Sequence, residues 1–105
     1  MIRAAFLKGR GGLVSAKVSG HAGFAPGGED IVCAGVSSAV MMAANGITEI
    51  LGVAARVLVS EAETVIELDD PPDFPASAFL RALYLHIDLL RQQYPDNITI
   101  TLSEV

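Results

Sequence analysis

Cysteine, histidine and tryptophan are scarce in this 105-residue sequence, which has one cysteine, two histidines and no tryptophan. A single cysteine excludes an intramolecular disulfide. One cysteine and two scattered histidines also match none of the ligand spacings of common metal sites. We therefore expect neither a bound metal nor another cofactor.

Positive charge is also scarce, with 7 Lys and Arg residues against 12 Asp and Glu residues and a formal net charge of -5. Affinity for nucleic-acid phosphates comes from clusters of Lys and Arg, so direct nucleic-acid binding is not expected. An acidic protein instead suits a basic partner, which long-range attraction steers towards it.

Charge is missing altogether from one long stretch, the 18 residues Ile31–Thr48. This length approaches that of a membrane span. The stretch contains glycine, serine and asparagine, however, and acidic Asp30 and Glu49 flank it, so we interpret it as a buried helix. Residues 1–6 resemble a strand rather than a signal peptide, because charged residues follow soon after them. The sequence thus predicts a cytoplasmic protein that does not enter the membrane.

Hydrophobic periodicity and turn residues predict seven elements in a single domain spanning residues 1–105. Two hairpins separated by helices indicate an α+β fold of order ββαββαβ, in which a mainly antiparallel sheet packs with two helices. The predicted elements are strands at 2–8 and 13–19, a helix from about 31 to 51 that stops at Gly52, strands at 56–60 and 64–68, a helix from about 75 to 94, and a strand at 98–103.

The first predicted helix is apolar or small on almost every side, which is typical of a helix buried on more than one face. A domain of this size buries only roughly 60–70% of the surface of its unfolded chain. Self-association would bury more of this surface, and a second subunit is one way to cover a face of the helix.

The segment from Gly20 to Ser38 carries the residue types that nucleophilic catalysis requires. If Asp30 is the N-cap of the helix, Cys33 takes the third helical position, where unpaired amides and the helix dipole favour a thiolate. The dipole contributes only about 0.3–1 kcal/mol, too little to make a strong nucleophile alone. His21 would contribute more, because an imidazole can take the thiol proton and return it to a leaving amine.

Several of these residues also have simpler interpretations. Cys33 can be a core residue, and His21 can be structural or exposed. Asp30 can orient His21 as well as cap the helix. Ser37, one turn after Cys33, can hydrogen-bond within the site or to the carbonyl four residues back. His86 falls inside the second predicted helix, where we expect a packing or interface role.

A glycine-rich loop lies between the histidine and the helix, and Gly20 permits a sharp turn at its start. Such a loop can cradle a phosphate, but this one lacks a lysine and the spacing of a phosphate-binding loop. It suits a lid that closes over a substrate, followed by first-turn amides that stabilise an oxyanion during acyl transfer. The predicted substrate loop comprises Ala22, Gly23, Phe24, Ala25, Pro26, Gly27, Gly28 and Glu29.

Three short motifs together are far more specific than a lone cysteine and histidine: Gly20-His21-Ala22, Asp30-Ile31-Val32-Cys33-Ala34 and Val36-Ser37. Together with the chain length and the order of elements, they resemble the ribosomal-processing cysteine protease family called Prp, or the YsxB-like proteins, over essentially the whole chain. Gly35 is a departure, since the family often has alanine at this position.

The resemblance implies a homodimeric cysteine protease that removes a short N-terminal extension from a bacterial large-subunit ribosomal protein. It implies Cys33 as the nucleophile and His21 as the general base and acid, while Gly20, Asp30 and Ser37 match further motif positions. The expected partner is therefore the extension of a basic ribosomal protein. The alternative is a non-catalytic ribosome-associated assembly or binding factor, in which Cys33 only packs.

Overall fold

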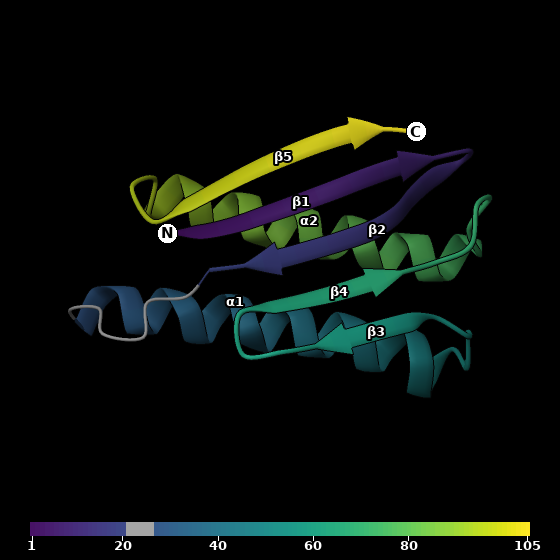
Figure 1. Ribbon diagram of the computed structural model, residues 1–105, viewed down its shortest axis with the longest axis horizontal. Coiled ribbons are helices and arrows are strands. Elements are labelled where there is room, and N and C mark those ends of the chain that lie inside the picture. Colours follow the sequence, from purple (N-terminus) through teal and green to yellow (C-terminus); the bar gives the residue numbers. More distant parts are fainter. Residues whose placement is uncertain (21–26) are drawn as a thin grey trace.

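The computed structural model describes residues 1–20 and 27–105, with the main chain alone at 27–30. It forms a five-stranded sheet with both helices on one face (Figure 1). The predicted α+β fold and the order ββαββαβ are confirmed. The elements are β1 (Ile2–Gly9), β2 (Gly12–Ser19), α1 (Gly27–Asn45), the π-helical turn η1 (Gly46–Ile50), β3 (Arg56–Val59), β4 (Glu63–Glu67), α2 (Phe74–Gln93) and β5 (Ile98–Glu104).

The strands lie in the order β3-β4-β2-β1-β5, and three of the four neighbouring pairs are antiparallel. The exception is β1, which pairs with β5 in parallel. Parallel strands need a crossover connection, which α2 supplies by carrying the chain from β4 over the sheet to the edge beyond β1. The sheet is therefore mainly antiparallel, as the two hairpins predict.

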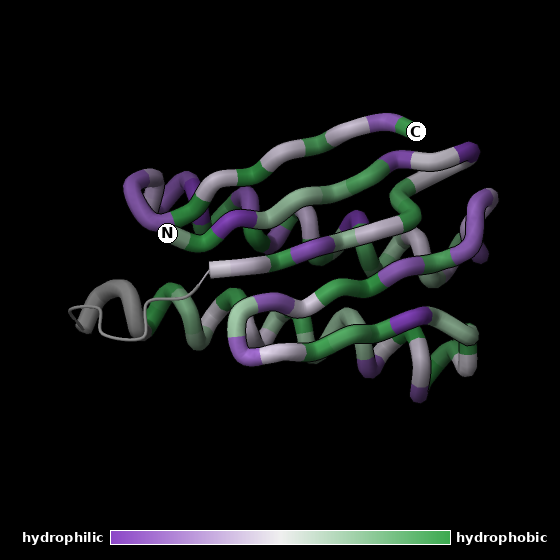
Figure 2. Tube along the Cα trace, viewed as in Figure 1, coloured by the Kyte–Doolittle hydropathy of each residue, from purple (hydrophilic) through white to green (hydrophobic). Residues whose placement is uncertain are grey.

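Strand residues alternate between a face that the helices cover and an open face. In β1, Ile2, Ala4 and Phe6 are buried, while Arg3 and Ala5 are exposed. Successive side chains of a strand point to opposite sides of a sheet, so the period of two in the sequence becomes a division between core and solvent. Figure 2 shows the same alternation along the strands in its hydrophobic and hydrophilic colours.

Helix α2 begins close to its predicted position because two residues favour a helix start there. The Asp73 side chain accepts a hydrogen bond from the Ala76 amide at 3.1 Å, and Pro75 lies in the first turn. Leu80 and Ile87, two turns apart, are fully buried against the sheet side of the fold. The cap and the apolar stripe together fix this helix across the sheet.

Helix α1 begins earlier than the sequence predicts. The loop was expected to reach Asp30, but α1 starts at Gly27, so residues 27–29 are helical rather than part of a loop. A preceding proline and acidic residues in the first turn both favour a helix start, which offsets the low helix propensity of glycine. At its other end, α1 continues through η1, and Gly52 ends it as predicted with a φ of 66°.

One face of α1 is buried and the other is open. Val32 and Val36 are buried, whereas Ile31 and Met42 are 68% and 65% exposed. The helical stretch Ile31–Ile50 is long and apolar enough to cross a membrane, with a mean hydropathy of 1.6, and 33% of it is buried within the fold. Burial on more than one face, which the sequence predicts, therefore requires a cover that the described part of the chain does not supply.

Candidate active site

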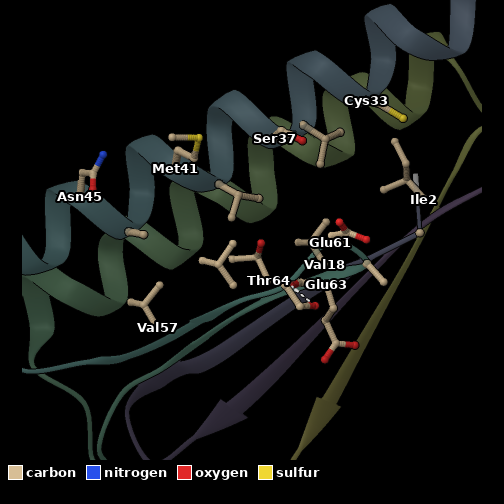
Figure 3. A pocket seen from close by; sticks show the side chains of 17 residues that line it. Ile2, Val18, Cys33, Ser37, Met41, Asn45, Val57, Glu61, Glu63 and Thr64 are labelled. Carbon is tan, nitrogen blue, oxygen red and sulfur yellow. Dashed lines mark hydrogen bonds between the residues drawn. The ribbon is translucent and has the colours of Figure 1, made fainter. Parts of the chain in front are cut away.

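A groove of about 410 Å³ lies between α1 and the hairpin formed by β3 and β4. Figure 3 shows Cys33 near one end of it, beside Ile2, and Asn45 near the other end. Valine and alanine side chains from both sides make most of its wall apolar. Such a groove suits the side chains of an extended peptide better than it suits a highly charged ligand.

The helix side of the groove is a straight row of four side chains. Cys33, Ser37, Met41 and Asn45 follow one another at four-residue spacing and all line the groove (Figure 3). With a rise of 1.5 Å per residue, the first and last of them lie roughly 18 Å apart along α1. An extended peptide of about five or six residues covers this length.

The groove exists because the two helices pack differently. Helix α2 lies directly against β2 and also contacts β5, whereas α1 packs against α2. This arrangement leaves α1 behind the outer strands β3 and β4 (Figure 1) with open space in between. The hairpin of β3 and β4 forms the opposite wall of that space.

Cys33 is half-buried and is the seventh residue of α1, in its second turn. The prediction that it lies in the first turn is wrong, because the helix begins at Gly27. The amides that lack helical partners belong to the start of the helix, ahead of Cys33, and the influence of the dipole falls off within the first turn. The helix dipole therefore stabilises a thiolate at Cys33 less than the sequence predicts. The unpaired amides of the first turn lie before this residue in the helix.

Gly20 lines the same groove as Cys33 and has the conformation that the sequence predicts for a sharp turn. Its φ is 75°, and a Cβ atom added to it would collide with the Met1 carbonyl oxygen. Its amide donates a hydrogen bond to the Ala62 carbonyl at 3.1 Å. The end of β2 therefore lies close against Met1 and is hydrogen-bonded to the turn between β3 and β4.

His21 and residues 22–26 of the predicted substrate loop lie outside the described residues. Residues 27–29, the rest of that loop, belong to α1. The sequence predicts Asp30 as the N-cap of the helix. This prediction is wrong, because Asp30 is the fourth residue of α1. Its remaining predicted role, in orienting His21, stays a prediction.

Ser37 and His86 lie on different helices and face different surroundings. Ser37 is exposed in the groove one turn after Cys33, and no hydrogen bond joins its hydroxyl to any part of the chain that the structure describes. His86 is exposed on α2, so it does not pack in the core. Ser37 thus remains a candidate for contact with a bound ligand.

The sequence reasoning missed the opposite wall of the groove, which comes from the turn between β3 and β4. Glu61 and Glu63 both line the groove there. The Glu63 carboxylate pairs with the Lys17 ammonium at 3.4 Å. The only sequence signal was the acidic composition of the turn, which is ordinary for a solvent-exposed hairpin.

Comparison with known proteins identifies the family of this chain. A family model described as cysteine protease Prp matches residues 1–99. The ribosomal processing cysteine protease Prp of Bacillus subtilis is 28% identical over 96 residues, which is 86% of each chain.

Solved structures share the whole fold. The crystal structure of SMU.848 from Streptococcus mutans matches with a TM-score of 0.90 and 27% identity, covering 100% of this chain and 96% of that one. An essential ribosomal processing protease Prp from S. aureus, solved with a substrate peptide, matches with a TM-score of 0.88 and 21% identity, covering 97% and 99%.

The fold, a cysteine that lines a groove of peptide dimensions, and these matches define the class of protein, which is a cysteine peptidase. Within that class, the chain belongs to the cysteine protease Prp family.

Proposed function

We propose that this protein is a cytoplasmic endopeptidase, with residues 1–105 as its single catalytic domain, that removes the short N-terminal extension of a bacterial large-subunit ribosomal protein. Cys33 is the nucleophile, and His21 is the general acid and base. The observation that carries the proposal is the position of Cys33 at one end of a groove that accommodates about five or six residues of extended peptide.

Chain connectivity supports the role that we propose for His21. Gly20, which is bonded directly to His21, lines the groove together with Cys33. Because the second-turn position gives the sulfur little help from the helix, the histidine carries most of the activation. Asp30 orients the imidazole, and residues 22–29, the last three of them within α1, contribute to closure over the substrate.

The proposed reaction is acyl transfer in two stages. His21 takes the thiol proton of Cys33, and the sulfur attacks the peptide carbonyl carbon to form a tetrahedral intermediate. The C–N bond then breaks as His21 donates its proton to the leaving amine. A water molecule, deprotonated by His21, attacks the thioester, and the Cys33 sulfur leaves and regains a proton.

The substrate assignment rests on the relatives. The S. aureus protease was crystallised with a substrate peptide and also with a covalently linked product peptide. A covalent product link is what a cysteine nucleophile would form. A peptide from the N-terminus of a ribosomal protein also fits the acidic charge of this chain, because ribosomal proteins are generally basic.

The test is cleavage of the extended ribosomal protein from the same bacterium, followed by mass spectrometry. Cys33→Ala should lose cleavage by at least about a thousandfold while it keeps the fold, because no other group forms the thioester. Ser38→Ala is the matched control, since this exposed serine lies on the same helix. Cleavage by Cys33→Ala at the wild-type rate would exclude the peptidase mechanism and favour the non-catalytic ribosome-associated factor.

A second measurement isolates His21. Alkylation by iodoacetamide reports how readily the Cys33 thiol loses its proton, because the thiolate is the reactive form. At about pH 6, the His21→Ala variant should react roughly tenfold more slowly than wild type. Equal rates would show that His21 does not act on the sulfur, even if Cys33 proves essential.

A further inference from the structure

The two carboxylates of the groove differ in what they already bind. Glu61 and Glu63 are the charged residues among the described groove lining. Glu63 pairs with Lys17 across the open face of the sheet, at 3.4 Å. Within residues 1–20 and 27–105, Glu61 forms no ion pair or hydrogen bond through its carboxylate. The groove therefore has one carboxylate whose charge is not already matched.

The position of Glu61 relates it to the nucleophile. Figure 3 shows its side chain turned towards α1, opposite the part of the helix that holds Cys33 and Ser37, whereas Glu63 points away from the helix. Cys33 and Ser37 are one turn apart, so this part of the helix corresponds to about two residues of extended peptide. A peptide that runs along the groove to Cys33 passes this carboxylate.

We propose that Glu61 is a specificity-determining residue that binds a lysine or arginine side chain of the peptide substrate within about two or three residues of the cleaved bond. The inference rests on the proposed function of the groove and adds the chemistry of one subsite to it. Apolar side chains of the same peptide lie on the valine and alanine walls. The peptide covers the carboxylate from solvent as it binds, which strengthens its attraction to a basic group.

Binding can be measured without turnover by using the full-length Cys33→Ala protein. The probes are fluorescein-labelled, terminally blocked decapeptides of alanine, leucine and phenylalanine, in which one lysine is moved through successive positions. Each has a counterpart with norleucine in place of lysine. At one or two adjacent positions, lysine should strengthen binding about two- to fivefold over norleucine, and higher salt should reduce this ratio.

The decisive comparison adds Glu61→Gln to the same background. It should bring the lysine-to-norleucine ratio close to one, and Glu61→Lys should instead favour a glutamate-containing peptide. Glu49→Gln is the matched control, because it makes the same charge change on an exposed residue of η1. The ratio should survive in this control.

Three results would overturn the inference: no binding of any peptide, equal binding of lysine and norleucine peptides at every position, or a ratio that Glu61→Gln leaves intact. Failure of the proposed function is a different result. It would appear as no Cys33-dependent cleavage of the ribosomal protein, whether or not the lysine preference is present. In the active enzyme, Glu61→Gln should raise KM for a lysine-containing substrate and leave kcat nearly unchanged, because the contact lies away from the reacting atoms.

Discussion

At the scale of single residues, the environment of the Cys33 sulfur depends on the residue at which α1 begins. Cys33 could be singled out from the sequence because the motifs around it and around His21 resemble those of a protease family, whereas the cysteine alone is typical of a core residue. The position of Cys33 in the second turn could not be predicted, because glycines before a helix are compatible with either a loop or a first helical turn. In the proposed mechanism, this position leaves most of the activation of the sulfur to the His21 side chain rather than to the helix dipole.

Gly20 gives the sharpest prediction at this scale. Gly20→Ala should reduce the free energy of unfolding by about 2–4 kcal/mol, because it combines a positive φ with a collision between the new Cβ and the Met1 carbonyl. Cleavage should fall as well, since Gly20 precedes the proposed catalytic histidine. Urea denaturation and the peptidase assay measure the two effects separately.

The Gly11→Ala variant measures the cost of a positive φ without a steric collision. Gly11 also has a positive φ, of 91°, but a Cβ atom added to it would meet no other atom within 4 Å. This variant should lose only about 1 kcal/mol and keep its cleavage activity. If both variants lost the same stability, contact with Met1 would not be what restricts position 20.

At the scale of elements, predictability followed the strength of local signals. The hairpin of β1 and β2 and the helix α2 appeared where expected, because alternation, turn glycines, Asp73 and Pro75 all act within a few residues. The start of α1 was not predicted, because its glycines leave the local signal ambiguous. The π-helical turn η1 was not predicted either, because it depends on packing against the rest of the fold. Gly46 shows this, because the Phe79 ring of α2 occupies the space beside it.

Two glycines of the α1–η1 helix should therefore respond oppositely to alanine. At Gly35, a Cβ would make only an ordinary contact with Leu90, at 3.8 Å, so Gly35→Ala should stabilise the protein by about 0.5–1 kcal/mol through helix propensity. Gly46→Ala should destabilise it by about 1–3 kcal/mol, because the Phe79 ring must move. Urea midpoints that shifted in the same direction for both would contradict this packing.

At the scale of the whole molecule, the groove arises from how the layers are offset. Helix α2 covers the middle of the sheet, and α1 packs beside α2 and stands behind the outer hairpin. No local pattern in the sequence encodes that offset, so the wall containing Glu61 could not be found from motifs. The same offset leaves a face of α1 open to solvent, with Ile31, Met41 and Met42 more than 60% exposed.

That open face leads to the prediction of a homodimer. Exposed apolar side chains that lie along one helix are typical of a surface that a partner covers. We expect the protein to sediment at twice the mass of its 11.0 kDa chain. Ile31→Glu and Met42→Glu should shift it to the monomer, because each buries a carboxylate in the interface. Met41 is left unchanged because it also lines the groove.

Leu58→Glu is the control for the added charge. Leu58 is 61% exposed, and it lies on the open face of the sheet because its neighbours Val57 and Val59 line the groove on the other side. This variant should keep the mass of the dimer in sedimentation velocity at the same concentration. A wild-type protein that sediments as a monomer, or Ile31 and Met42 variants that behave like Leu58→Glu, would show that α1 is not the face through which two copies associate.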